Sequence, residues 1–550
     1  MGVGDTTSPR RHGPPISAQL PVETWAHILS YLPAAERIPA LSVNRLLHDV
    51  ALRFVHSSVH IHLGAWETVH PNFNDLGIPA PELLRRNAQR SAEILQHIVT
   101  NARFAKNVRK LSVYAFAPGD AMRAAAMRLL NILTQALERL PNLTTFHWIG
   151  CEPLPVDAVI DYFVSRIPPL KELRIPARPF DAFPRMLAFN SLASLCLSSK
   201  NYIEHMGGYN IADLDAIADT TRSIILNNVG SLLSLTVFAS VFDHIAPDSL
   251  GRSLVELDVW ACDGLTAIYP ILSHCPRLTA LALLEVTCTD PSSFHPLAPD
   301  PPPLPRLSSF KLIALDEVSR AQYAQIAAFL AQHPALRRLD LDMPCRDLEP
   351  ILALLPDLER LQVLGLDVRA YPDLARVADA LPRGLRALHV QTRWDLLPVE
   401  AEELKPLVDA IFETKPLTML HFENVFMEKQ RSAETFVKSL PELEVIMLRD
   451  DCWTVYRELP LVPDARGQHV VRGQAVAQAA AGMSTRPLPD AATAVQAEAA
   501  RTRVRFWLEK WPRGKVVFRT ADDYTDPDHE WLLRFHGIQD DLTDLGSEEG

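Results

Sequence analysis

A short apolar phrase recurs along most of this chain and constrains its fold more than any other feature. The phrase is an apolar residue, two variable residues, a second apolar residue, one variable residue and a third apolar residue, as in PALRRLDL at 334–341. Thirteen copies recur with a mean period of about 28 residues. Their first apolar residues are Val108, Leu143, Leu170, Leu192, Leu232, Leu254, Leu278, Leu307, Leu336, Leu358, Leu385, Leu417 and Leu443.

Each copy predicts a short strand, because its second and third apolar residues are two positions apart and point to the same side. The stretches 155–168, 321–334 and 402–415 lie between copies and carry apolar residues at helical spacing. In the second of them these residues are Tyr323, Ile326, Ala327 and Leu330. A strand and a helix in each unit predict an α/β fold, an irregular leucine-rich-repeat solenoid whose units pack on their neighbours. The alternative is an ordinary α/β protein with chance clusters of leucine.

The prolines support a repeated architecture. The chain has 44 prolines and 21 glycines, yet 48% of its residues are hydrophobic, which excludes a mostly disordered chain. Nine of the 13 copies follow a proline by one to three residues, where proline can end a helix and open an extended segment. These prolines are Pro141, Pro168, Pro276, Pro305, Pro334, Pro356, Pro382, Pro416 and Pro441.

Charge and cysteine content narrow the functional class. A net charge of −12 disfavours nucleic acid as a partner. We find no run of about 18 apolar residues and expect neither a membrane span nor a signal peptide. The seven cysteines form no CxxC pair or tight cluster, so we expect reduced thiols, no metal or cofactor, and a cytoplasmic or nuclear location.

The N-terminal segment 20–51 predicts a compact helical module. Leu20-Pro21-x-Glu23 is typical of a helix start, because proline fits a first turn and an acid suits the helix dipole. One apolar face follows, formed by Trp25, Ile28, Leu29 and Leu32. Pro33 is expected to end this helix, and a second apolar set follows, formed by Ile38, Leu41, Val43, Leu46 and Leu47. So small a module has an apolar face left over for a partner helix bundle.

This segment resembles an F-box. The family pattern opens with Leu-Pro-x-Glu, continues to Ile-Leu-x-x-Leu and closes with Val-x-Arg. Here it is carried by Leu20, Pro21, Glu23, Ile28, Leu29, Leu32, Val43 and Arg45. The match covers about 32 residues and precedes a repeat array, so the chain looks like the leucine-rich F-box proteins that are numerous in fungi. The alternative is an N-terminal helical cap for the solenoid.

The resemblance implies a non-catalytic substrate receptor of an SCF-type ubiquitin ligase. Such a receptor docks a Skp-family adaptor, which connects it to a cullin and RING scaffold, and its repeats bind the target protein. The residues expected to contact the adaptor are Leu20, Pro21, Glu23, Trp25, Ile28, Leu29, Leu32, Ile38, Leu41 and Val43. A leucine-rich interaction scaffold without a ubiquitin role is the competing function.

Target binding is expected on the strand face that alternates with the apolar positions. His147 and Arg174 lie at such positions, and we expect Trp260 to be an exposed anchor and Asp340 with Asp342 to be a charge pair. The full expected target-binding set is Asp258, Trp260, Lys311, Asp340, Asp342, His389, Gln391, His421, Glu423 and Arg449. The alternative for any one of these residues is that it only solvates the sheet.

Two further signals have simpler interpretations. His56, His60 and His62 have metal-like spacing, but they lack an acidic or cysteine partner nearby, and the alternation favours a strand with one polar face. The basic and aromatic segment 501–520 favours a strand pair around 512–514 over a nucleic-acid site. We find no nucleotide-binding, hydrolase, metalloprotease or kinase motif.

These observations predict the following organisation: 1–15 a disordered arm, 16–60 the helical module, 61–455 the solenoid with a proline-rich insertion at 291–305, 456–500 a linker, 501–536 a small cap and 537–550 an acidic tail.

Overall fold

A computed structural model gives the fold in two compact units, one running to Leu257 and the other starting at Asp258. We describe each unit by itself. The structure describes residues 20–31, 34–64, 81–116, 120–153, 155–165, 169–176, 188–198, 211–262, 265–287, 294, 304–314, 317–343, 347–368, 373–391, 417–423, 429–448, 451–457, 461–463, 469–471 and 506–510.

The first unit begins with three helices and continues as a strand–helix array. The three helices are α1 (Val22–Tyr31), α2 (Ala34–Val43) and α3 (Arg45–Val55). The array contains β1 (Ser58–Gly64), α4 (Pro81–Thr100), α5 (Ala102–Ala105), β2 (Lys110–Phe116), α6 (Asp120–Leu137), β3 (Thr145–Glu152), α7 (Asp157–Val164), β4 (Glu172–Pro176), β5 (Ser194–Ser198), α10 (Ile211–Asn228), β6 (Ser234–Phe238), η3 (Ala239–His244) and α11 (Pro247–Leu250). Strands β1 to β6 pair in chain order and run parallel.

The second unit repeats this plan. Strand β7 (Glu256–Trp260) lies at its border with the first unit. The elements that follow are α12 (Leu265–Leu272), β8 (Ala280–Val286), β9 (Ser309–Ala314), α13 (Arg320–Ala331), β10 (Arg338–Asp342), α14 (Glu349–Leu354), η4 (Leu355–Asp357), β11 (Val363–Asp367), α15 (Leu374–Ala380), β12 (Ala387–Gln391), β13 (Met419–Glu423), α17 (Lys429–Ser439) and β14 (Val445–Leu448). Strands β8 to β14 are parallel and in chain order.

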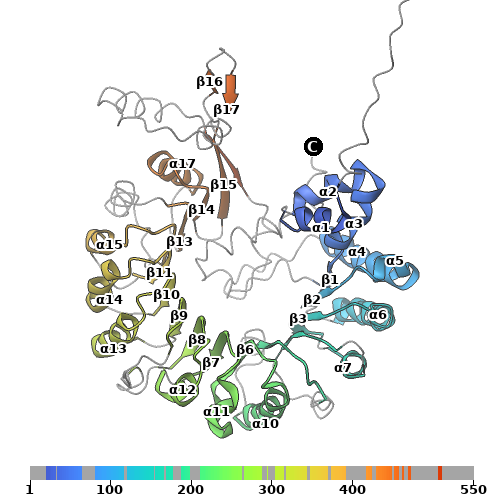
Figure 1. The fold of residues 1–550 in the computed structure, drawn as a ribbon, viewed down its shortest axis with the longest axis horizontal. Helices are drawn as coiled ribbons and strands as arrows, with labels where there is room; N and C mark the ends of the chain where they lie inside the picture. The colour runs from blue at the N-terminus through green and yellow to red at the C-terminus, as the bar shows by residue number, and fades with distance from the viewer. Residues whose placement is uncertain are drawn as a thin grey trace, which may run out of the picture. The chain divides into compact units, whose positions relative to one another are not determined.

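In both units the described helices that alternate with the strands lie along one face of them (Figure 1). The strand residues that point towards the helices are apolar and buried, as in β1, where Val59, Ile61 and Leu63 alternate with partly exposed residues. Successive strands are also joined at their starts: the backbone amides of Lys171 and Glu172 both donate to the carbonyl of Thr144, at 2.8 and 3.1 Å. This arrangement confirms the α/β strand–helix solenoid, because each repeat packs on its neighbours in the sequence.

Most copies of the phrase begin two residues before a strand, but the copy assigned to Leu358 is wrong. Strand β11 starts at Val363, which pairs with Arg338 of β10. This register shows that the three apolar positions of the phrase in this repeat are Leu361, Leu364 and Leu366. The reason is local: a short 3₁₀ turn, η4, occupies Leu355–Asp357, so the strand begins later than the apolar spacing indicated. The sheet also starts earlier than predicted, since β1 begins at Ser58 and pairs in parallel with β2.

Helix α13 lies where the stretch 321–334 predicted a helix. A capping box starts it: the backbone N–H of Gln322 donates to the Ser319 hydroxyl, and the Gln322 side chain accepts from the Ser319 backbone. Tyr323, Ile326 and Leu330 are buried, as their spacing indicated. The predicted helix at 402–415 lies outside the described residues.

The C-terminal part departs from the expected linker. Strand β15 (Asp451–Arg457) adds antiparallel to β14, and β18 (Phe506–Lys510) adds antiparallel to β15. Within the predicted linker 456–500, β16 (Leu461–Pro463) pairs with β17 (His469–Val471). The arm 1–15, the acidic tail 537–550 and most of the insertion 291–305 lie outside the described residues. None of the helices that are described is long and apolar enough to cross a membrane.

Candidate functional site

The first candidate site is the N-terminal module formed by α1, α2 and α3. The module has a small core of its own, consisting of Leu29, Ala40, Leu47, Val50 and Ala51. Four partly buried apolar residues pack against this core, namely Trp25, Ala26, Leu41 and Phe54. The guanidinium of Arg37 on α2 also lies 5.6 Å from the centre of the Phe54 ring on α3. The three helices are thus packed together without a partner.

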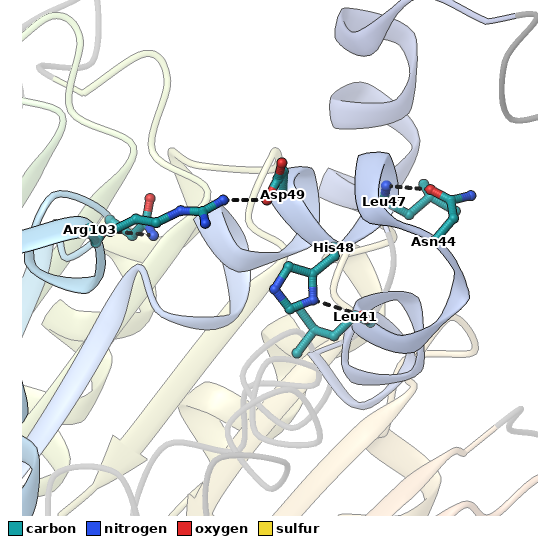
Figure 2. Close-up of polar contacts among 7 residues, drawn as sticks. Leu41, Asn44, Leu47, His48, Asp49 and Arg103 are labelled. Carbon is teal, nitrogen blue, oxygen red and sulfur yellow. Dashed lines mark hydrogen bonds and ion pairs between the residues drawn. The ribbon is translucent and has the colours of Figure 1, made fainter. Parts of the chain in front are cut away.

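Two polar contacts hold the sharp turn between α2 and α3 (Figure 2). Asn44 is the N-cap of α3, and its side-chain oxygen accepts from the backbone N–H of Leu47 at 2.9 Å. One turn further on, Nδ1 of His48 lies 2.8 Å from the carbonyl oxygen of Leu41. Because the carbonyl can only accept, Nδ1 is the donor in this contact. The Val-x-Arg part of the sequence pattern therefore spans this turn, with Val43 ending α2 and Arg45 beginning α3.

The module is attached to the first repeat. Arg103 on α5 donates to Asp49 on α3 at 2.5 Å (Figure 2), and the rings of His56 and Phe104 lie 5.0 Å apart. The Arg103 and Asp49 side chains are largely exposed, so this ion pair contributes little to stability by itself. Its geometric effect is to connect α3 with the helix that precedes β2.

Exposed apolar side chains gather on α1 and α2. Among the described residues, five of the nine large hydrophobic residues that remain exposed lie between positions 20 and 43, with exposed fractions from 37% to 63%. They are Leu20, Val22, Ile28, Ile38 and Val43. Scattered exposed apolar residues are ordinary, whereas a contiguous apolar patch is typical of an interaction surface, so this group is a candidate for binding a partner. We call these five residues the apolar face.

The structure divides the expected adaptor-binding residues into two groups. Leu20, Ile28, Ile38 and Val43 lie on the apolar face, together with exposed Pro21 and Glu23. Pro21 also starts α1, because its carbonyl accepts from the amides of Thr24 and Trp25.

The remaining expected residues point the other way. Leu29 is buried in the module core and is not available at the surface of the module, whereas Trp25 and Leu41 pack against that core and stay partly exposed, so their contact with an adaptor stays a prediction. Helical spacing places Ile28 and Leu29 side by side but does not say which of them points inward. Leu32 lies outside the described residues, and Val22 is an exposed residue that the motif did not mark.

The second candidate site is the strand face of the second unit. Register places Lys311 of β9 beside Asp340 of β10, and their side chains form an ion pair with Nζ and Oδ2 3.6 Å apart. On β12 and β13, His389 and His421 are register partners, and their rings stack 4.4 Å apart with an interplanar angle of 14°. Polar side chains on neighbouring strands therefore contact one another along this face.

Burial contradicts the expectation that this face is open. Trp260 is only 4% exposed, and Asp340, His389, Gln391 and His421 are also buried. Strands β11, β12 and β14 are buried along their whole length, so both of their faces are covered. The two-residue period tells which face a side chain occupies but not whether that face is covered. Asp258, Lys311 and Asp342 keep partial exposure, while Arg449 and the Glu423 side chain lie outside the described residues.

The strand face of the first unit is more open. On β1 to β5 most of the described residues that alternate with the buried ones are partly exposed, while Ser112 and Ile149 are buried. Strand register places Lys110, Thr145 and Glu172 in one row and Ser112, His147 and Arg174 in the next. We call these six residues the first-unit polar rows.

Glu172 is the centre of the hydrogen bonding in these rows. It lies 2.6 Å from Nε2 of His147 and accepts from the hydroxyl of Thr145 at 3.3 Å. These contacts, with Lys110 nearby, hold the pKa of Glu172 below its ordinary value, and the hydrogen bond from His147 is the largest cause. Burial lowers the pKa of His147 in spite of its acidic partner, so the neutral imidazole donates to the carboxylate.

Sequence reasoning identified His147 and Arg174 but missed Lys110 and Glu172. The missed residues come directly before the second apolar position of their repeats, and the same two-residue period places them on the open face. Extending the alternation one step towards the N-terminus would have found both residues.

The histidine-rich stretch forms the predicted strand. His60 and His62 lie on the same face of β1, and both stack on Tyr114 of β2, with ring centres 5.9 and 5.1 Å apart respectively. Burial, together with the charges of His60 and Arg90, lowers the pKa of His62 to about 3. Within the described ranges no group of three His, Cys, Asp or Glu residues is placed to hold a metal ion.

Comparison with known proteins gives similarity at the level of solved structures. No protein-family model matches the chain, and no curated protein matches it. A chain in the crystal structure of the Rad7 and Elc1 complex in yeast is similar with a TM-score of 0.39 and 14% identity, over 70% of this chain and 90% of that chain. A chain of the TLR13–ssRNA13 complex is similar with a TM-score of 0.27 and 14% identity, over 62% of this chain and 46% of that one. Neither similarity carries an inference about function.

Proposed function

We propose that this chain is the substrate-recognition subunit of an SCF-type ubiquitin ligase. The N-terminal module docks a Skp-family adaptor, which joins the chain to a cullin and RING scaffold, and the solenoid binds the target protein. The chain performs no bond chemistry, needs no cofactor and acts in the cytoplasm or nucleus. Its contribution is proximity, because binding raises the effective concentration of target lysines near the charged ubiquitin-conjugating enzyme.

The observation that carries this proposal is the apolar face. The core of the module is already filled by Leu29, Leu47 and Val50, so the exposed residues have no further role in packing the three helices. Burial of the exposed part of an Ile, Leu or Val side chain contributes about 1 kcal/mol. Five such side chains supply about 5 kcal/mol towards association before its entropic costs are subtracted. A helical partner with a matching apolar surface satisfies this requirement.

The motif and its position support the same function. The Leu-Pro-x-Glu and Val-x-Arg elements bracket the apolar face in the sequence, and the Asn44 cap orders the second of them. The link between Asp49 and Arg103 connects the module to the repeat array. Because the module is connected to the repeats, an adaptor bound to the module is held close to a target bound to the repeats.

Co-purification with a Skp-family adaptor tests the proposal. The test variants are Ile38→Asp and Val43→Asp, which place a charge on the two most exposed residues of the apolar face and leave the module core intact. We expect each variant to weaken adaptor binding at least about tenfold. Leu226→Asp is the matched control, because Leu226 is similarly exposed but lies on α10, away from the module.

The competing function makes the opposite prediction. If the native chain is folded and fails to bind the adaptor, the ubiquitin-ligase role is wrong, and the interaction scaffold becomes the better interpretation. If Ile38→Asp and Val43→Asp bind the adaptor as well as Leu226→Asp does, the assignment of the apolar face is wrong.

A further inference from the structure

We infer that one edge of the second unit binds an acidic, extended segment of the target protein through a set of exposed arginines. These residues are Arg277, Arg306, Arg337, Arg360, Arg383 and Arg386, and we call them the arginine edge. The inference rests on the proposed function, in which the solenoid holds the target, and it adds the chemistry of the segment and the residues that recognise it.

All six arginines lie in the segments that lead into strands β8 to β12. These segments are 273–279, 304–308, 332–337, 355–362 and 381–386. The five strands are parallel and follow one another in the sheet, and β8 to β11 are seen side by side in Figure 1. The segments that enter these strands therefore meet at one edge. Because neighbouring strands are about 4.8 Å apart, the arginine edge extends over about 19 Å.

Hydrogen bonds between neighbouring repeats fix the backbone of this edge. The amide of Arg337 donates to the carbonyl of Ser308, and the amide of Arg386 donates to the carbonyl of Gln362, both at 2.7 Å. The leucine that precedes Arg337, Leu336, is buried, whereas Arg337 itself is exposed. The edge therefore presents its arginines from an ordered backbone and directs them away from the core.

The guanidinium groups of the arginine edge are available to a ligand. All six residues are exposed, and in the described part of the chain none of their side chains forms a hydrogen bond or an ion pair. The same five segments contain two carboxylates, Asp357 and Glu359, and a third, Asp379, lies near the end of α15. Arginine remains charged at every ordinary pH, so positive charge exceeds negative charge along this edge. An acidic ligand is complementary to that excess.

The repeat fold does not require these arginines. Five of them lie one or three positions before a strand start, and β8 to β12 offer ten such positions in all. The same ten positions before β2 to β6 of the first unit hold only two basic residues, Arg109 and Lys171. Both sets of repeats form parallel strands in chain order, so arginine is not needed at these positions to build them.

Capping of the preceding helices does not account for the arginines either. Helix α12 ends five residues before Arg277, and α13 ends six residues before Arg337. The attraction between a cation and a helix dipole falls off within the last turn, so both arginines lie beyond its reach. Arg457 provides a contrast, because its guanidinium donates to the carbonyls of Leu440 and Leu443 directly after α17.

The arginine edge favours a protein segment over a nucleic acid. The five segments, all of them described, contain no Phe, Tyr or Trp on which a base could stack. Asp357 and Glu359 lie beside Arg360, where they repel a continuous polyanion. An extended peptide can place uncharged residues there, and its carboxylates can each accept two hydrogen bonds from a planar guanidinium. About six extended residues span the edge.

The test measures binding of fluorescent peptides to the full chain. One peptide, about ten residues long so that it covers the edge, alternates Glu with Ser, and its control has Gln in place of every Glu. We expect the native chain to bind the Glu peptide in preference to the Gln peptide, with an affinity that falls as salt is added. Arg306→Gln with Arg337→Gln should weaken Glu-peptide binding about fivefold, because two charge contacts are removed.

Two further double variants separate local charge from net charge and folding. Arg109→Gln with Lys171→Gln is the matched control, because it removes the same charge from exposed positions directly before β2 and β4 of the first unit, and it should bind like the native chain. Arg306→Lys with Arg337→Lys keeps both charges and should keep the preference for the Glu peptide. The inference is overturned if the native chain does not distinguish the two peptides, if the Lys double variant loses the preference, or if the Arg306 and Arg337 Gln variant binds like the control.

Two parallel measurements distinguish the other outcomes. An oligonucleotide that binds more tightly than the Glu peptide, and loses binding in the Arg306 and Arg337 Gln variant, would overturn the inference in favour of nucleic acid. Adaptor co-purification is measured on the same chains. Failure of the native chain to bind the adaptor contradicts the proposed function, whereas equal binding of the two peptides with adaptor binding intact contradicts this inference alone.

Discussion

Nε2 of His147 lies 2.6 Å from Oε1 of Glu172, and this contact joins β3 to β4 on the open strand face of the first unit. The pKa of the carboxylate is lowered mainly by this hydrogen bond, and the pKa of the imidazole is lowered mainly by burial. When the pH is above both ordinary pKa values, each group is in the state that stabilises the contact. Glu172 is then ionised and accepts, and His147 is neutral and donates.

Glu172→Gln should reduce the free energy of unfolding at neutral pH by about 1 kcal/mol, a modest value because the Glu172 side chain is partly exposed to solvent. A carboxylate with a lowered pKa stabilises the fold above its unfolded pKa, and this contribution is lost as the pH falls through the folded pKa. The difference between Glu172→Gln and the native chain should therefore shrink below pH 4.5. Urea unfolding at several pH values measures it. Exposed Glu138→Gln is the control, and equal behaviour of the two variants would contradict the prediction.

His62 should make the first unit sensitive to mild acid. Its folded pKa is about 3 and its ordinary value is 6.5, so the unfolded chain takes up the proton first and stability falls as the pH decreases from 6.5 towards 3. Between pH 7.5 and 5 we expect a loss of about 1–2 kcal/mol, which allows for the remaining exposure of the ring. His62→Phe keeps a flat ring beside Tyr114 and should remove this loss. An unchanged pH dependence in His62→Phe, relative to exposed His274→Phe, would show that other groups are responsible.

Asn44→Ala should loosen the start of α3. The substitution removes the acceptor for the Leu47 amide and should cost about 1 kcal/mol. Hydrogen exchange of the amides in the first turn of α3 should become about fivefold faster, since this energy corresponds to that factor. Asn44→Asp keeps a side-chain acceptor and should restore the slower exchange. If Asn44→Asp exchanges as fast as Asn44→Ala, the cap is not the cause.

Leu29 and Val43 should respond oppositely to truncation, although the motif contains both. Leu29→Ala removes a buried side chain from the small module core and should cost about 2–4 kcal/mol. Val43→Ala changes a side chain that is 63% exposed and should cost less than about 0.5 kcal/mol. Protease protection of residues 20–56 in the full chain measures both effects. Similar protection in the two variants would contradict the inward position of Leu29.

Cys275 should be inert towards thiol reagents in the folded chain. Its side chain is buried, its sulfur donates to the carbonyl of Ile271 at 3.2 Å, and burial raises the pKa of the thiol to about 12. The thiolate that reacts with iodoacetamide is therefore scarce. Peptide mapping by mass spectrometry should find Cys275 labelled only after denaturation, and rapid labelling of the native chain would contradict this environment.

The repeat was predictable because its period is local. An apolar residue at every second position defines a strand face, and helical spacing defines the segment that covers that face. The strand residues Leu339 and Leu341 and the helix residues Tyr323 and Ile326 could therefore be assigned to the core without knowledge of distant contacts. The copy at Leu358 shows the limit of this reasoning. An apolar phrase three residues too early matched the pattern equally well, and only pairing between Arg338 and Val363 defines the register.

The site was less predictable for the same physical reason. Alternation placed His389 and His421 on the polar face, but whether that face meets water depends on what packs over it, and no local pattern encodes this. Likewise, neighbouring Ile28 and Leu29 are equivalent in the motif, and packing of α1 on α3 decides that Leu29 is core while Ile28 stays exposed.

By itself, the sequence determined that the chain forms strand–helix repeats after an N-terminal helical module, because hydrophobic periodicity and proline positions act over a few residues. Only the tertiary structure decided which of the polar and apolar side chains are available to partners. Availability depends on strand register and packing between segments far apart in the sequence, as in the pairing of Glu172 with His147, 25 residues apart.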